Sequence, residues 1–380
     1  MSAVFFGERT RVSNPMGGRV QQLDVLRGVA VLLVLVHHSP GGEGALLKAG
    51  WTGVDLFFVL SGFLVSGLLF KEHLRSGRIR PGRFYLRRGL KIYPNFYAML
   101  AVTSVALVWT RTPFETRGLV HEAVFLQNYL PAAWWAREHG WSLAVEEHFY
   151  FLLPPALLLL LRWRSFQRAP LRCSVVLTAS LGAVLLAVRC AMVRSGATAV
   201  DVLFLTHTRL DSLAFGVMLS VLWHFTPAHI ETVRRFRGGL LTAGLLLTAP
   251  CYVLSNEHWL VLTLGLSLNY VGYGLVLIAV LTVRGSLAGP LAPVLAFVGF
   301  YSYSIYLWHP PILAVIRDGL GDRPLGILLY YAGAIGGGVL AARLVELPAL
   351  RLRERWLPSG GPARLAPPGT PEASTPARAR

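Results

Sequence analysis

Charged residues are scarce in this sequence: Asp, Glu, Lys and Arg make up 14% of its 380 residues, whereas hydrophobic residues make up 54%. An ordinary soluble domain has roughly 25% charged residues, so the composition excludes a typical soluble protein. Apolar runs of membrane-spanning length recur along the whole chain. Because runs of this length are typical of helices that cross a bilayer, we predict an all-α polytopic membrane protein.

Cysteine is also scarce. The three cysteines, at positions 173, 190 and 251, lie in or beside apolar runs, and no CxxC spacing accompanies them. We therefore expect neither a disulfide framework nor a metal site. A signal peptide is not expected either, because residues 1–22 contain no short apolar segment followed by a small-residue cleavage site. The first predicted span would itself direct insertion.

Ten apolar runs are long enough to cross a hydrocarbon core of about 30 Å as helices. They cover residues 23–39, 51–70, 93–109, 148–161, 173–193, 209–225, 239–255, 259–283, 292–316 and 325–346. The sequence thus predicts a bundle of about ten transmembrane helices over residues 23–352, with 259–283 as one helix. Residues 1–22 would form a cytoplasmic segment, and residues 353–380, rich in Pro, Ala, Gly and Ser, a disordered cytoplasmic tail.

The formal net charge is +17, and the placement of the basic residues accounts for it. If the N-terminus is inside, most of the 36 Lys and Arg fall in cytoplasmic segments. This asymmetry is the positive-inside pattern of membrane proteins. It predicts that both termini are cytoplasmic, and it gives no reason to expect a nucleic-acid partner.

The first span, LDVLRGVAVLLVLVHHSP at residues 23–40, carries ionisable side chains near both ends. Arg27 and His38 share one helix face about 16 Å apart, while His37 points about 80° away. Because an arginine that faces lipid is costly, we expect the shared face to look into the bundle. Alternatively, Arg27 snorkels to headgroups and His38 is an interfacial histidine.

The second span, WTGVDLFFVLSGFLVSGLL, starts at residue 51 and would enter from the outer side. Asp55 then lies at nearly the depth of His38, where a carboxylate could fix the imidazole tautomer and support a general base. Ser61 lies deeper in the span. With Gly62 it could line a substrate path, or it could serve close helix packing.

The loop KEHLRSGRIRPGRFYLRRGLKIYP at residues 71–94 is strongly basic. On a helix Arg87 and Lys91 share a face and Arg88 flanks it. Forked guanidinium groups at a membrane surface suit polyphosphates, so these residues are candidates for binding a phosphate-bearing ligand. Alternatively, the loop attracts lipid headgroups and sets the topology.

The segment WSLAVEEHFYFLLP at residues 141–154 closes a long external loop. Adjacent residues face different directions on a helix, so we expect at most one of Glu146 and Glu147 to point into a cavity. Trp134 and Trp141 have flat faces that could receive a sugar, or they could belong to the interfacial aromatic belt.

Polar residues also interrupt later spans. Arg209 and Asp211, in TRLDSLAFG, diverge by about 200° on a helix and cannot form a local pair. We expect each to find a partner on another helix, mainly for structural support. His309, in YSYSIYLWHPPI, is assigned a structural polar role as well.

Taken in order, these motifs resemble those of the acyltransferase-3 family of integral membrane O-acyltransferases. The likeness extends from about residue 22 to residue 352. It implies transfer of an acyl group, commonly acetyl from acetyl-CoA, to a hydroxyl of a carbohydrate or glycosylated small molecule. It further implies a multi-pass protein of the bacterial cytoplasmic membrane, with acyl-CoA as co-substrate and no other cofactor.

Position by position, the resemblance makes Arg27 and His38 the family's paired Arg and His, and His38 the catalytic residue. Lys91 stands where Arg is commoner and lacks the planar fork, and His148 stands where Gln is usual. Many relatives carry an extra C-terminal esterase-like domain, which is not expected in this chain. The expected catalytic residues are His38, Asp55, Glu146 and Glu147, and the expected donor-binding residues are Arg27, Ser61, Arg87, Arg88 and Lys91.

Other functions fit parts of the pattern. A transporter or flippase could use the intramembrane charges as a proton relay, although the motifs show no internal repeat. Transport in reconstituted vesicles without acyl-CoA would favour that alternative. Within the enzyme interpretation, the acceptor could be an envelope polysaccharide, its lipid-linked precursor or a macrolide-like secondary metabolite.

Overall fold

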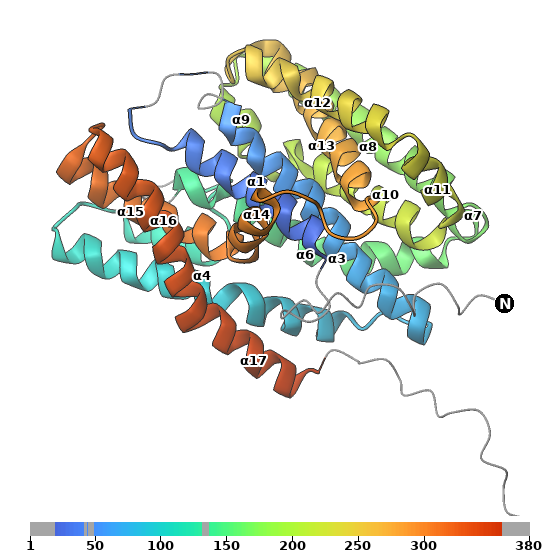
Figure 1. Ribbon diagram of the computed structural model, residues 1–380, viewed down its shortest axis with the longest axis horizontal. Helices are drawn as coiled ribbons and strands as arrows, with labels where there is room; N and C mark the ends of the chain where they lie inside the picture. Colours follow the sequence, from blue (N-terminus) through green and yellow to red (C-terminus); the bar gives the residue numbers. More distant parts are fainter. Residues whose placement is uncertain (1–19, 42–43, 45–48, 131–136, 359–380) are drawn as a thin grey trace, which may run out of the picture.

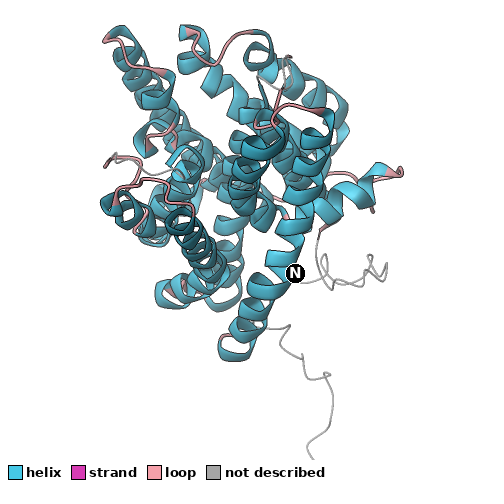
Figure 2. Ribbon diagram, turned by 90° about the vertical axis from the view of Figure 1, so that its left-hand side faces the viewer, coloured by secondary structure: helices cyan, strands magenta, loops and turns pink. Residues whose placement is uncertain are grey.

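The computed structural model describes residues 20–41, 44, 49–130 and 137–358. Throughout these residues the regular structure is helical and no strand occurs (Figures 1 and 2). The all-α prediction is therefore confirmed for the described part of the chain.

The main helices cover the predicted apolar runs, and several of them extend beyond these runs. They are α1 (Gln21–His37), α3 (Gly53–Ser76), α4 (Pro81–Trp109), α6 (Arg137–Arg162), α8 (Pro170–Arg194), α10 (Leu210–Phe225), α12 (Arg237–Val253), α13 (Leu266–Leu281), α14 (Leu291–Phe300), α15 (Ser302–Leu320), α16 (Pro324–Ala341) and α17 (Leu347–Trp356). Shorter helices connect them: α5 (Thr116–Ala123), α7 (Arg164–Arg168), α9 (Ala199–Leu203) and α11 (Ala228–Arg235). Single π-helical turns, Val261–Gly265 and Ala342–Glu346, lead into α13 and α17.

Within the described residues, six helices are long and apolar enough to cross a membrane, or up to eight if each of two bent pairs counts as one span. The protein is thus polytopic. Two further predicted spans correspond to α1 and α12, shorter helices of 17 residues each that are not among these. The predicted run 259–283 is one continuous span, Val261–Leu281.

One predicted run does not form a straight helix. The run 292–316 is divided into α14 and α15, which meet at an angle of 74°. The run 209–225 forms one helix, α10, and the chain bends by 113° only beyond it, into α11. At the first bend, Gly299 packs so closely on the backbone of Asp24 in α1 that a Cβ atom there would overlap it. The contact holds α14 against α1, while α15 turns away toward α16.

Glycines allow the central helices to approach one another closely. A Cβ atom on Gly28 of α1 would overlap the backbone of Leu295, and one on Gly62 of α3 would overlap the backbone of Leu213 in α10. Small residues permit such close crossings in membranes. Consequently α1 and α3 lie at the centre of the bundle (Figure 1).

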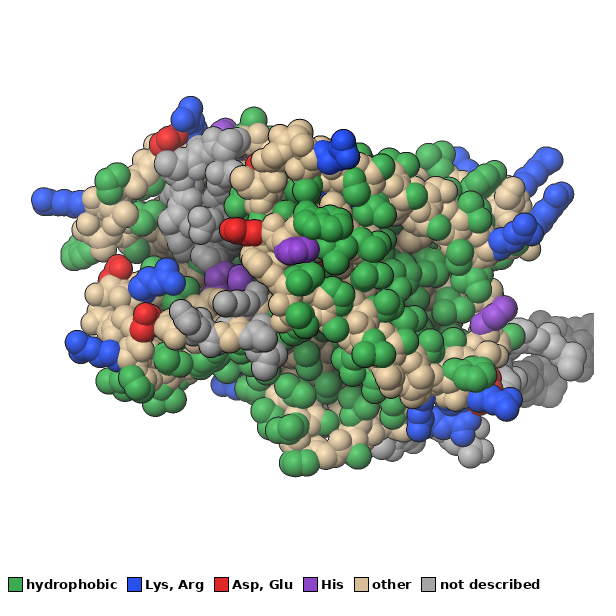
Figure 3. Space-filling model, turned by 90° about the horizontal axis from the view of Figure 1, so that it is seen from above, with side chains coloured by type: hydrophobic (Ala, Val, Ile, Leu, Met, Phe, Trp, Pro, Cys, Tyr) green, Lys and Arg blue, Asp and Glu red, His purple; other side chains and the backbone are tan. Residues whose placement is uncertain are grey.

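The outer surface suits a lipid environment. Large hydrophobic side chains on several outer helices are exposed, including Leu246 on α12, Leu328 on α16 and Val105 on α4. Figure 3 shows one face on which hydrophobic side chains cover the middle and most Lys and Arg lie toward the two ends. This arrangement matches a bilayer belt between two aqueous surfaces.

Candidate active site

A cavity of about 410 Å³ lies between α1, α3, α4, α6 and α15. Its walls are mainly Leu, Val and Phe side chains. Five residues predicted from the sequence line it: Arg27, Ser61, Arg88, Lys91 and Glu146. The structure therefore brings together polar side chains from four different helices in one apolar chamber.

The polar wall is organised around Arg88 and Glu146. The Arg88 guanidinium lies over the ring of Tyr150, 3.9 Å from its centre, with Nη2 4.0 Å from Glu146 Oε2. The Ser61 hydroxyl donates a hydrogen bond of 2.5 Å to the other Glu146 oxygen and accepts one of 3.1 Å from Tyr150. Tyr150 was not predicted, although it lies one helical turn after Glu146.

The adjacent glutamate faces elsewhere. Glu147 accepts a hydrogen bond of 3.1 Å from Tyr93 of α4 and does not line the cavity. The prediction that at most one of the two glutamates points into a cavity is thus confirmed.

The basic residues of α4 point in two directions. Arg88 and Lys91 line the cavity, whereas Arg87 donates a hydrogen bond of 2.7 Å to Glu354 of α17 and another to the Leu357 carbonyl. Lys91 therefore shares the cavity wall with Arg88, and Arg87 does not. The reason is that α17 packs beside the start of α4 and offers Arg87 a carboxylate.

Two histidines from distant parts of the chain meet at the end of α1. The rings of His38 and His309 have centres 5.0 Å apart. Nδ1 of His38 lies 2.9 Å from the Val34 carbonyl oxygen. Since a carbonyl only accepts, Nδ1 carries the hydrogen, and in the neutral ring Nε2 bears the lone pair.

The orientation of His309 follows from the proline after it. Pro310 has no N–H and cannot donate to the carbonyl of Tyr306, four residues earlier. The His309 Nδ1 donates to that carbonyl instead, at 2.6 Å. His309 is fully buried, and its neutral Nε2 is again the accepting nitrogen. Tyr306 lines the cavity and its ring centre is 5.6 Å from that of His309, but His38 and His309 themselves are not among the residues that line the cavity.

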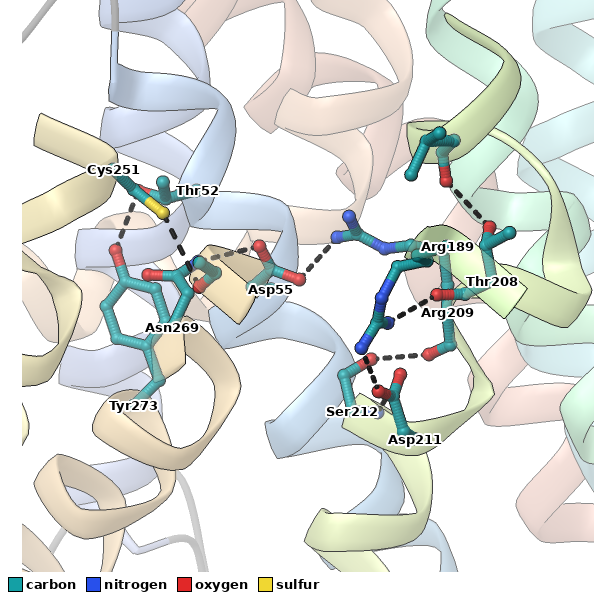
Figure 4. A network of polar contacts seen from close by, with 12 residues as sticks. Thr52, Asp55, Arg189, Thr208, Arg209, Asp211, Ser212, Cys251, Asn269 and Tyr273 are labelled. Atoms are coloured by element: carbon teal, nitrogen blue, oxygen red, sulfur yellow. Dashed lines mark hydrogen bonds and ion pairs between the residues drawn. The ribbon is translucent and has the colours of Figure 1, made fainter. Parts of the chain in front are cut away.

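Asp55 does not contact His38. Its carboxylate forms an ion pair with Arg209 of α10 and accepts a hydrogen bond of 2.7 Å from Asn269 of α13 (Figure 4). Asp211 pairs with Arg189 of α8 at 2.9 Å. The prediction that Arg209 and Asp211 each bind a partner on another helix is confirmed, and the network of Figure 4 connects α3, α8, α10 and α13.

The tryptophans of the sequence prediction have different outcomes. Trp141 is buried, and its ring stacks on Phe204 with centres 4.9 Å apart. One face of the ring is thus covered by protein. Trp134 lies outside the described residues.

His148, which stands where the family usually has Gln, binds the Thr206 hydroxyl through Nδ1 at 2.7 Å.

In the described part of the chain, no group of three or more His, Cys, Asp or Glu side chains is arranged to hold a metal ion.

Four residues of the site and its supporting network could not be predicted from the sequence, because tyrosines and single polar residues are common in spans. They are Tyr150, Tyr306, Arg189 and Asn269. Their importance comes only from the helices they face.

Fold and site together define a polytopic helical membrane protein with a cavity that is lined by basic and acidic side chains and by Tyr306, which adjoins His309. The chain belongs to the acyltransferase-3 family: the family's acyltransferase domain matches residues 20–343.

Relatives agree with this assignment. The chain is 28% identical over 354 residues to the peptidoglycan O-acetyltransferase OatA of Listeria monocytogenes, covering 87% of this chain and 55% of the relative. It is 26% identical over 352 residues to the O-acetyltransferase OatA of Staphylococcus aureus, covering 86% of this chain and 56% of the relative. A relative from Staphylococcus aureus strain MRSA252 is 28% identical, and the chain covers 59% of its length. The chain thus spans less than two thirds of the length of these relatives. No solved structure matches the sequence.

Proposed function

We propose that the protein transfers an acetyl group from acetyl-CoA to a hydroxyl of an envelope carbohydrate. The observation that carries the proposal is the cavity itself. The cationic side chains Arg27, Arg88 and Lys91 line it, and so does Tyr306, whose ring centre is 5.6 Å from that of His309 in the histidine pair. Phosphates would bind at the cationic end, and the thioester would lie at the histidine end.

The proposed chemistry follows from the orientation of His38. Its Nε2 would remove the proton from the acceptor hydroxyl while that oxygen attacks the thioester carbon. A new carbon–oxygen bond forms, the carbon–sulfur bond breaks, and the departing CoA thiolate takes the proton back from His38. His309 would keep His38 in place and face the imidazolium with a neutral, accepting nitrogen. Asp55 would support this site only indirectly, through its ion pair with Arg209, which joins α3 to α10.

The proposal includes the topology. Ten spans, with α1 and α12 among them and both termini cytoplasmic, would place the cationic end of the cavity at the cytoplasmic surface of the inner membrane. Acetyl-CoA is then supplied from one side, and the acceptor reaches the histidines from the other.

The proposal is tested with purified protein in nanodiscs, radiolabelled acetyl-CoA and peptidoglycan fragments released by muramidase, with O-linked label in the fragments as the readout. Label in the fragments and its loss in His38→Ala would support the proposal. Label that appears only in an added macrolide would show that the acceptor is a macrolide and not a carbohydrate. Absence of any transfer by a folded protein would refute an acetyl-CoA-dependent reaction.

A further inference from the structure

The first turn of α15 lies in the wall of the cavity. Ser302 is the first residue of this 19-residue helix, and both Ser302 and Tyr303 line the cavity. The first N–H groups of a helix have no partner within that helix, and they form the positive end of its dipole. Tyr301, at the N-cap, makes no side-chain cap hydrogen bond, and the first turn contains no acidic residue. The turn thus lacks the side chains that usually complement a helix N-terminus.

The Ser302 side chain is a second, independent observation. Ser302 has 0% of its surface exposed, and its Oγ has no hydrogen-bond partner among the described residues. A buried hydroxyl without a partner lowers stability, so folding alone gives no reason for a serine here. Ser304 is equally buried, but it accepts a hydrogen bond of 2.8 Å from Asn95 and donates one of 2.6 Å to Glu346. Of these two serines, the one with the unpartnered hydroxyl is the one that lines the cavity.

On one side of this turn lies α1. Gly299, three residues before Ser302, packs against the backbone of Asp24 and Gly28. Arg27, in the same turn of α1, lines the cavity together with Ser302, as does Asp24. A guanidinium group therefore belongs to the cavity wall close to the start of α15.

On the other side of the turn lies α4. The Tyr303 hydroxyl donates a hydrogen bond of 2.8 Å to the carbonyl of Ile92, and Lys91, the residue before Ile92, lines the cavity. Glu146 lines it as well, but its carboxylate accepts a hydrogen bond from Ser61 on α3. The first turn of α15 thus lies between a helix that presents a guanidinium group to the cavity and one that presents an ammonium group.

We propose that the first turn of α15 binds the diphosphate group of the acyl-CoA donor. The inference rests on the proposed function and assigns an anion subsite within the donor side of the same site. The Ser302 hydroxyl and the backbone N–H groups at the start of the helix donate hydrogen bonds to the phosphate oxygens, as helix N-termini commonly do. Arg27 and Lys91 supply the opposite charge.

The spacing along α15 selects the diphosphate from the phosphates of CoA. Ser302, Tyr306 and His309 are related as i, i+4 and i+7, so they share one helix face, and seven residues advance about 10 Å along the axis. The face therefore leads from the proposed subsite to the histidine pair. In CoA the diphosphate is joined to the pantetheine arm that ends in the thioester, whereas the 3′-phosphate lies beyond it on the ribose. The diphosphate is thus the anionic group that reaches deepest into the cavity.

The experiment measures the binding of three compounds to purified protein in dodecyl maltoside without acceptor. They are CoA, dephospho-CoA, which lacks the 3′-phosphate, and pantetheine, which has no phosphate. We expect Ser302→Ala to weaken binding of CoA and dephospho-CoA about tenfold each, as loss of a hydrogen bond to a charged group does, and to leave pantetheine binding unchanged. Ser304→Ala is the matched control, because Ser304 lies in the same turn, is equally buried and does not line the cavity. It should leave all three affinities unchanged.

Thermal melting separates this role from a structural one. Ser302→Ala should melt at the same temperature as wild type or higher, because its Oγ has no partner to lose. Ser304→Ala should melt at a lower temperature, because Asn95 and Glu346 each lose a hydrogen bond. A lower melting temperature of Ser302→Ala, or an equal loss of pantetheine binding, would show that Ser302 serves the fold and would overturn the subsite.

Further outcomes separate the subsite from the proposed reaction. Unchanged CoA binding in Ser302→Ala would refute the subsite alone, and absence of CoA binding in wild type would refute both. A loss for CoA but not for dephospho-CoA would assign Ser302 to the 3′-phosphate instead. A difference between wild type and Ser302→Ala that appears only in phosphatidylglycerol nanodiscs would assign it to a lipid headgroup. The expected losses in a protein that transfers no acetyl group would support the subsite and refute the reaction.

Discussion

At the scale of single residues, His309 has two separable features: Nδ1 satisfies the carbonyl left open by Pro310, and Nε2 belongs to the histidine pair. Asparagine can supply the first feature, because its amide can donate to the Tyr306 carbonyl, but it has no equivalent of Nε2. We expect His309→Asn to melt close to wild type while kcat falls roughly tenfold or more and KM for acetyl-CoA stays constant.

His309→Leu is the matched control for this prediction. It removes both features and should lower the melting temperature as well, because the buried carbonyl of Tyr306 loses its donor at a cost of about 1–3 kcal/mol. Near-normal turnover in His309→Asn would restrict His309 to the structural role predicted from the sequence.

The two neighbouring arginines of α4 should differ sharply. Arg88 lines the cavity, whereas Arg87 binds α17. Arg88→Lys retains the charge beside Glu146 but loses the planar fork and the contact with the Tyr150 ring, so KM for acetyl-CoA should rise about tenfold. Arg87→Lys should change KM for acetyl-CoA by no more than about twofold, which is less than the loss of one hydrogen bond to the donor would cause. Steady-state kinetics measures KM for acetyl-CoA in both variants. Equal rises would indicate that both side chains bind the donor.

At the scale of helices, the close crossing of α1 and α14 depends on glycine. In Gly28→Ala the new methyl group would meet the backbone of Leu295, and overpacking of this kind typically costs about 1–3 kcal/mol. The crossing should open, the melting temperature should fall, and activity should fall because α1 carries Arg27 and His38. Melting curves and transfer assays on the purified variant measure both effects.

Gly336 of α16 provides the comparison. A Cβ atom there would meet nothing within 4 Å, so Gly336→Ala should keep or slightly raise the melting temperature through better helix propensity. Equal decreases of the melting temperature in Gly28→Ala and Gly336→Ala would show that α1 and α14 do not cross tightly at Gly28.

Helix positions could be predicted from hydropathy because lipid requires long apolar runs. The bend between α14 and α15 could not, since apolar content is continuous across it and the turn depends on how Gly299 meets α1. Polar cavity residues such as Ser61 and Glu146 could be predicted because they stand out in apolar runs. The partners of Asp55 could not, because they depend on which helices are neighbours in space.

At the scale of the whole molecule, the topology can be tested directly. A single cysteine at Arg80 or at Thr112, both exposed, is introduced after the three native cysteines are replaced. In intact cells, we expect a membrane-impermeant thiol reagent to label position 112 and to reach position 80 only after the cells are opened. Labelling of position 80 from outside would reverse the proposed side for acetyl-CoA.

Ser61 and Gly62 are adjacent on α3, yet one lines the cavity and the other closes the crossing with α10. The consequence is a limit on how this chamber can be re-engineered for longer acyl chains. Helix α3 cannot shift to accommodate changes at residue 61, because Gly62 already packs against the backbone of α10. Leu64 and Leu68, on the same helix and also facing the cavity, lie farther along α3, so chain-length selectivity is better altered there.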